Sequence, residues 1–263
     1  MLSRDRLTRT LLGLAGSSIA LFVLWHAVLL PIGWPSLSLV GHYLAESAMS
    51  GETFKAMLMT AFRSVVSVVL GFSFALVMGL FTGRTRLGWI AFFFLLMFLQ
   101  KVPAIAMVHV LVKSKLGIGF ITTVVLASTV VLTFTWQVLH HRAATLDLRE
   151  VFTLRLLGFK GWRLVWHGLL PHLGSALGGA ARLAVGIALV LVILGEWQGV
   201  WSDGTIWQYG LGIQISRAYD AIDSEARVLA YCVWLGVLGI MLDLGVQVVL
   251  RGARRVLGVD FKR

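Results

Sequence analysis

Five charged residues lie inside or at the ends of long apolar runs of this sequence, where charged side chains are rare. They are the basic residues Arg63, Lys101 and Arg182 and the acidic residues Glu196 and Asp243. A charge near the centre of a bilayer costs roughly 2.5–3.5 kcal/mol on insertion scales, so each one needs an ionic partner or water. Such groups could line a passage for a polar or anionic solute, or they could form buried structural pairs.

Lys101 lies about midway along its apolar run, which makes it the strongest candidate for a passage. Arg63 is nearer the end of its run and could instead extend its guanidinium to the interface. The run that holds Lys101 is interrupted by Pro103, which removes a backbone donor and bends a helix. Broken membrane helices often line cavities, although a packing kink would look the same in sequence. The predicted passage residues are therefore Arg63, Lys101, Pro103, Glu196 and Asp243.

A basic segment at residues 140–171 separates two of the apolar runs. A short amphipathic helix is expected at about 148–157, and Gly158 should end it because glycine readily takes the left-handed conformation of a helix C-terminus. Its apolar positions are Leu148, Val151, Phe152 and Leu154, and its polar positions are Arg149, Glu150 and Arg155. Segments of this kind either lie on the membrane surface or dock on a soluble partner.

Motifs for catalysis are missing from the sequence. It contains no GxxxxGK[ST] phosphate loop, no HExxH and no GxSxG, and its carboxylates do not form a catalytic pair. His140 and His141 fall at the end of an apolar run, where an interfacial pair is expected, and Cys232 is the single cysteine. We therefore expect a non-catalytic chain without a metal or cofactor of its own.

Composition indicates an all-α integral membrane protein. Of 263 residues, 58% are hydrophobic and 13% are charged, and the mean hydropathy is +0.88. A spanning helix needs roughly 20 mostly apolar residues. About six transmembrane helices are predicted, near residues 11–30, 57–81, 89–112, 118–139, 172–195 and 228–250. The whole chain, residues 1–263, is read as one transmembrane domain.

The distribution of positive charge predicts the topology. With the N-terminus inside, fifteen Lys and Arg residues fall on the cytosolic side, five fall outside and three fall within spans. Both termini are then cytoplasmic, and the net charge of +11 reflects topology instead of nucleic-acid binding. The first apolar run is longer than the core of a signal peptide, so a retained span is expected.

Two long connectors are predicted on the outer side, at residues 31–56 and 197–227, and a tight outer turn is predicted at 113–117. The second carries Trp197, Trp201, Trp207 and Tyr209. These rings form either an interfacial aromatic belt or a cage around a ligand. Gly174 and Gly178 form a GxxxG pattern that favours close helix packing.

Several of these features resemble the inner-membrane permease subunits of type I bacterial ABC importers, and within them the nitrate/sulfonate/taurine branch. Gly158, Leu170 and Pro171 occupy the Gly and Leu-Pro positions of the family's cytosolic signature at the correct separation. The chain departs from the signature where Phe152-Thr153-Leu154 replaces Glu-Ala-Ala and Gly168 replaces Ile. The order of Arg63, the kink at Pro103, Glu196 and Asp243 matches the family more loosely along nearly the whole chain.

The resemblance implies an ATP-driven importer that works by alternating access. Two such subunits, expected to be a homodimer, would form the pathway for a small organic or inorganic anion such as a sulfonate, nitrate or carboxylate. A cytosolic ABC ATPase dimer would bind ATP and Mg, and an extracytoplasmic binding protein would deliver the solute in the bacterial inner membrane. The short helix between spans four and five would be the coupling helix. The predicted ATPase contacts are Leu148, Arg149, Glu150, Phe152, Leu154, Arg155, Leu157, Gly158, Leu170 and Pro171.

Two other functions remain open at the level of sequence. One is an ion-coupled carrier or channel that works without an ATPase, and the other is a membrane scaffold. Secondary carriers usually contain internal repeats, and none is found here. Likewise, the short cytosolic helix could simply lie among lipid headgroups.

Overall fold

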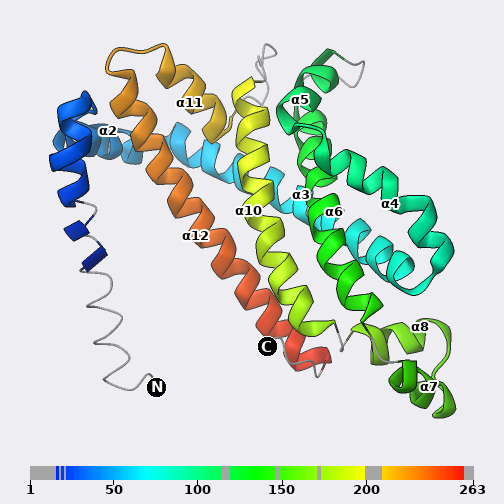
Figure 1. Ribbon diagram of the computed structural model, residues 1–263. Helices are drawn as coiled ribbons and strands as arrows, with labels where there is room; N and C mark the ends of the chain where they lie inside the picture. Colours follow the sequence, from blue (N-terminus) through cyan, green and yellow to red (C-terminus); the bar gives the residue numbers. More distant parts are fainter. Residues whose placement is uncertain are drawn as a thin grey trace, which may run out of the picture.

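The structure is a computed structural model that describes residues 16–17, 19–20, 22–113, 119–145, 148–170, 173–198 and 209–257. Within these ranges the elements are helical and no strand occurs (Figure 1). Four helices are long and apolar enough to cross a membrane. They are α3 (Gly51–Arg84), α6 (Phe120–Ala144), α10 (Gly174–Gln198) and α12 (Ser224–Leu257).

These four helices correspond to the second, fourth, fifth and sixth predicted spans. The expected six spans are thus reduced to four of full length among the described residues. The first predicted span lies partly outside those residues. Its described part is helical and runs through η1 (Trp25–Leu29) into η2 (Leu30–Ile32).

The third predicted span is broken into two shorter helices, α4 (Arg86–Lys101) and α5 (Ala104–Lys113). Val102 has an extended backbone, with φ −71° and ψ 124°. A residue before proline avoids the helical region because of a clash with the proline ring. The interruption expected at Pro103 is therefore confirmed, and neither piece is long enough to be one of the four candidate spans.

Small residues hold α3 tightly against α6. A Cβ added at Gly71 would lie 2.6 Å from the Ser128 carbonyl oxygen, and one added at Gly79 would lie 2.8 Å from the Leu139 Cβ. Without competing water, helices in a membrane associate by close packing, which small residues permit. Ala75 lies between the two glycines on the same buried face and belongs to the core around Trp136 and Leu139.

Two short helices fill regions predicted as outer connectors. In the first connector, α2 (Leu37–Met49) begins at Ser36, whose Oγ accepts a hydrogen bond from the Leu39 amide. Ser is a favoured residue at this position because it satisfies a free amide of the first turn. In the second connector, α11 (Leu211–Tyr219) buries most of its side chains beside α10 and α12. Residues 199–208 of that connector, with Trp201 and Trp207, lie outside the described residues.

The opposite end of the bundle carries α7 (Leu148–Leu156), α8 (Gly161–Leu164) and η3 (Val165–Leu169). The last turns of α12 lie at this same end, whereas α2 and α11 lie at the other (Figure 1). The two ends of the bundle thus hold different kinds of polar structure, which are described in turn below.

Candidate functional site

A buried ion pair joins α3 to α10. Arg63 Nη1 donates to Glu196 Oε1 at 2.6 Å, and both side chains are fully buried, with 0% exposed. Thr60, one helical turn before Arg63, donates its hydroxyl to the same carboxylate at 2.9 Å and 3.0 Å. The expectation that Arg63 could extend to the interface is therefore wrong, because the buried carboxylate holds its guanidinium inside the bundle.

The same cluster holds the start of α11. The amide of Leu211 donates to Thr60 Oγ1 at 2.9 Å, and the amide of Gly212 donates to Glu196 Oε2 at 3.0 Å. A carboxylate at this place satisfies free amides and matches the positive end of the helix dipole. Arg63 Nη1 also donates to the Tyr209 carbonyl at 2.8 Å.

Two glycines make this approach possible. A Cβ added at Gly210 would lie 2.5 Å from the Glu196 Cδ, and one added at Gly212 would lie 2.4 Å from the Ile193 carbonyl oxygen. We therefore read the cluster of Thr60, Arg63 and Glu196 as a lock between three helices. Because its charged groups are fully buried, it offers no surface to a solute in this conformation.

A second ion pair, between α10 and α12, is exposed. Arg182 donates from Nε to Asp243 Oδ1 at 2.7 Å and from Nη2 to Asp243 Oδ2 at 3.0 Å. Gln247 Nε2 donates to Asp243 Oδ2 at 2.8 Å. The side chain of Arg182 is 56% exposed and that of Asp243 is 33% exposed. This pair has unsatisfied hydrogen-bonding capacity at an open surface.

Lys101 does not join either pair. It is an exposed residue at the C-terminal end of α4, where a positive charge suits the helix dipole. Its helix lies on the other side of α6 and α10 from α12, which carries Asp243 (Figure 1). The sequence predicted Lys101 in the middle of a span. Because the span is broken at Pro103, Lys101 instead lies at the end of a helix. Pro103 itself is exposed between the two helices.

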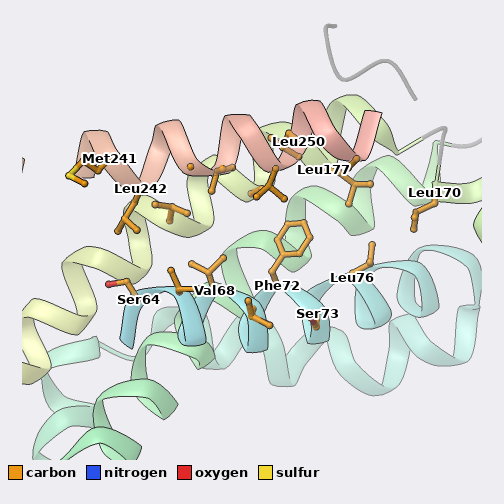
Figure 2. Close-up of a pocket in the computed structure, with 18 residues that line it drawn as sticks. Ser64, Val68, Phe72, Ser73, Leu76, Leu170, Leu177, Met241, Leu242 and Leu250 are labelled. Atoms are coloured by element: carbon orange, nitrogen blue, oxygen red, sulfur yellow. The ribbon is translucent and has the colours of Figure 1, made fainter. Parts of the chain in front are cut away.

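An apolar groove of about 600 Å³ lies between α3 and α12, with α10 as its floor (Figure 2). Phe72 rises from α3 toward α12 in this view, near Leu250 of α12, and Leu242 lies farther along α12, over Ser64. Among its lining side chains, only Ser64 and Ser73 carry a polar group. The groove therefore has no charge with which to bind a small ion, and it is distinct from the Arg182–Asp243 pair.

The predicted amphipathic helix is present as α7, and Gly158 ends it. Gly158 has φ +87°, a left-handed conformation that suits glycine. Its amide donates to the Arg155 carbonyl at 3.1 Å, and the amide of Phe159 donates to the Leu154 carbonyl at 3.1 Å. These two hydrogen bonds together form a Schellman motif. Phe159 and Leu154 also belong to one small apolar cluster, a contact that usually accompanies this motif.

The structure divides the apolar side chains of α7 differently from the sequence prediction. Val151 is 6% exposed and packs with Leu164, and Leu154 is half-buried in the same cluster. Phe152, however, is 62% exposed, and so are Leu156 at 72% and Leu157 at 69%. The outward surface of α7 is thus formed by Phe152 and Leu156, together with Leu157 just after the end of the helix. Leu156 was missed by sequence reasoning.

Exposed basic residues occur in α7 and in the segment that follows it. They are Arg149, Arg155, Lys160 and Arg163. Leu148 and Glu150 lie within α7, at its start. The combination of exposed apolar side chains and positive charge is typical of a docking surface.

The departure from the family signature at Gly168 has a local cause. A Cβ added at Gly168 would lie 2.5 Å from the Leu154 Cδ1, so glycine allows η3 to lie close to α7. Leu170 follows and is buried in the core with Leu173 and Leu177. Pro171 lies outside the described residues.

Sequence reasoning missed Gln247, and it noted Thr60 and Arg182 only through the resemblance of Thr60-x-x-Arg63 and Arg182-Leu-Ala-Val-Gly186 to the family's spans, without a role for either. Thr60 does stand one turn before Arg63, and Gln247 stands one turn after Asp243, which places each pair on one helix face. That spacing was a usable signal. The partner helices of these pairs, in contrast, could not be read from spacing.

No protein-family model and no curated protein matches this chain. Among solved structures, the chain is similar to a chain of the MetNI methionine ABC transporter, solved in inward facing conformations in a CY5 native crystal form. The TM-score is 0.61 with 17% sequence identity, and the match covers 78% of this chain and 99% of that chain. The chain therefore has the fold of that ABC transporter chain.

Proposed function

We propose that this chain is the membrane-spanning subunit of an ATP-driven solute importer. The observation that carries the proposal is its likeness in fold to a chain of the MetNI methionine ABC transporter, over nearly all of that chain. The sequence contains no GxxxxGK[ST] phosphate loop. Energy from ATP and Mg would accordingly come from a cytosolic ABC ATPase dimer and not from this subunit.

The docking surface for the ATPase is assigned to the outward side of α7. Phe152, Leu156 and Leu157 would insert into an apolar groove of the partner, and Arg149 and Arg155 would meet acidic residues at its rim. The Schellman motif at Gly158 fixes the end of α7, and Val151 and Leu164 pack it onto the rest of the loop. Closure of the ATPase dimer on ATP would then move α7 together with the spans it connects.

A second copy of the subunit and an extracytoplasmic binding protein complete the proposed assembly, in a bacterial inner membrane with both termini cytoplasmic. The solute is proposed to be a small organic or inorganic anion, as in the nitrate/sulfonate/taurine branch. The solved structure that resembles this chain belongs to a methionine transporter, so the branch rests on sequence resemblance alone.

The experiment is co-purification of the tagged chain with a cytosolic ATPase from membranes of the native cell. Phe152→Asp and Leu156→Asp should each abolish co-purification, because each places a carboxylate in an apolar contact. The matched control is Ile222→Asp, which changes an 85% exposed apolar residue at the opposite end of the bundle and should leave co-purification intact.

Unchanged recovery of the ATPase with both α7 variants would refute the docking surface. Transport by the purified chain in vesicles without nucleotide or a second polypeptide would refute the importer itself and favour a channel or ion-coupled carrier.

A further inference from the structure

The exposed pair of Arg182 and Asp243 lies within the membrane-spanning part of the chain. Arg182 stands six residues into the candidate span Ala176–Gln198, about 9 Å from its start, and Asp243 stands ten residues, about 15 Å, before the end of Ser224–Ala253. The hydrocarbon layer is about 30 Å thick. The span Ser224–Ala253 has 30 residues and is about 45 Å long, so when it is centred on this layer Asp243 lies about 8 Å inside the layer's edge. Arg182 is held at the same depth by its hydrogen bonds to Asp243.

Such a pair does not face lipid. Charged groups within spans face a water-filled cavity or other protein, because hydrocarbon cannot solvate them. Arg182 nevertheless remains 56% exposed. The surface in front of it must accordingly be covered by water or by protein in the assembled membrane.

The helix face beside Arg182 is unobstructed. Gly179, Gly186 and Val190 are exposed at spacings that place them on the same side of α10 as Arg182. A Cβ added at Gly179 or at Gly186 would meet nothing within 4 Å. The open face therefore extends along α10 for several turns, with one charged group in it.

The hydrogen bonds of the pair favour a ligand that accepts hydrogen bonds. A guanidinium has five N–H donors, and two of those of Arg182 are taken by Asp243. The carboxylate of Asp243 already accepts three bonds, from Arg182 Nε, Arg182 Nη2 and Gln247 Nε2. Free donors on the arginine thus outnumber free acceptor positions on the aspartate.

We propose that Arg182 lines the solute path and binds an oxyanionic group of the solute, such as a carboxylate, sulfonate or phosphate. Asp243 and Gln247 are positioning residues, which hold the guanidinium so that its Nη1 hydrogens point into the path. A planar guanidinium suits this role because it can bind two oxygens of one oxyanion together. The inference rests on the proposed function and assigns the path to the open face of α10 rather than to the apolar groove.

The test measures the reactivity of a cysteine placed on this face with small charged reagents. Gly186→Cys is made in a Cys232→Ser background and labelled in membrane vesicles with the anionic sulfonatoethyl and the cationic trimethylammonioethyl methanethiosulfonates. Each rate is normalised to that of a free thiol. Both reagents should react, and with Asp243→Asn the anionic one should be favoured about tenfold, because a single fixed charge concentrates counter-ions in a narrow path.

The arginine variants decide the role of Arg182. Arg182→Gln should reverse the preference toward the cationic reagent, because Asp243 is then the remaining charge. Arg182→Lys, which keeps the charge, should restore the preference of the parent protein. A lipid-facing control, Val77→Cys on α3, is 65% exposed and should react with neither reagent.

Three results would overturn the inference. Gly186→Cys could react only with a membrane-permeant maleimide, which would mean a lipid-facing position. It could form a disulfide with a second copy and resist both reagents, which would mean a dry contact between subunits. Finally, the ratio of the two rates could be unaffected by Arg182→Gln. If Gly186→Cys fails to insert, Gly179→Cys serves as the reporter, and none of these readings depends on recovery of the ATPase.

Discussion

The buried lock of Thr60, Arg63 and Glu196 allows a prediction with a calculable size. Glu196→Ala removes the acceptor for Arg63 Nη1, for the Thr60 hydroxyl and for the Gly212 amide at once. The guanidinium of Arg63 would remain inside the bundle with the Tyr209 carbonyl still bound. A buried charge without its partner strongly destabilises the folded state.

Breaking a buried ion pair by removing one partner costs about 3–5 kcal/mol. For a protein of this size a loss of 1 kcal/mol lowers the melting temperature by about 2–4 °C. Glu196→Ala and Arg63→Met should therefore each lower Tm by about 6–20 °C. The double variant Arg63→Met/Glu196→Met should melt above either single variant, because replacing a buried pair with apolar side chains is often nearly neutral.

The assay is thermal unfolding of the purified protein in one detergent, followed by tryptophan fluorescence. The matched control is Asp243→Asn, which breaks the exposed pair. Its cost should stay within about 1 kcal/mol, or less than about 4 °C in Tm. If the two single variants of the lock lose no more than this control, or if their losses simply add in the double variant, the reasoning about the buried pair is wrong.

Two further predictions concern other parts of the fold. Gly71→Val should lower Tm by about 2–12 °C, because its Cβ would lie 2.6 Å from the Ser128 carbonyl and overpacking costs about 1–3 kcal/mol; Gly179→Val, which meets open space, should change it far less. At the end of the bundle that carries α2, the Tyr43 hydroxyl donates to Asp223 at 2.8 Å, and this bond raises the pKa of Tyr43 above 10.0. The stabilisation from that bond should be complete below pH 10 and disappear as pH rises through the raised pKa. The late-titrating part of the tyrosinate absorbance should decrease in Tyr43→Phe, and a Tyr43 that titrates with free tyrosine would refute the contact.

Local features of the sequence predicted a large part of the fold. Four of the predicted apolar runs are full-length helices in the structure. In a membrane the backbone amides and carbonyls have no water to bond, so a long apolar segment satisfies them within a helix. Pro103 broke the third run and Gly158 ended α7, since both act through their own backbone geometry. The short helices α2 and α11 were missed because, at 13 and 9 residues, they are shorter than the roughly 20 residues that a spanning helix needs. In addition, α11 is held in place by groups on other helices.

The pairing of the membrane charges was decided by tertiary structure. Arg63 and Glu196 are 133 residues apart, and Arg182 and Asp243 are 61 residues apart. Sequence identified these residues as costly charges that need partners, because that cost is a property of each group in hydrocarbon. It could not assign the partners, since a contact between two helices depends on how each is rotated and on how far it is shifted along the other. The same rotation set the outward side of α7, where Phe152 and Leu156 are exposed while Val151 is buried.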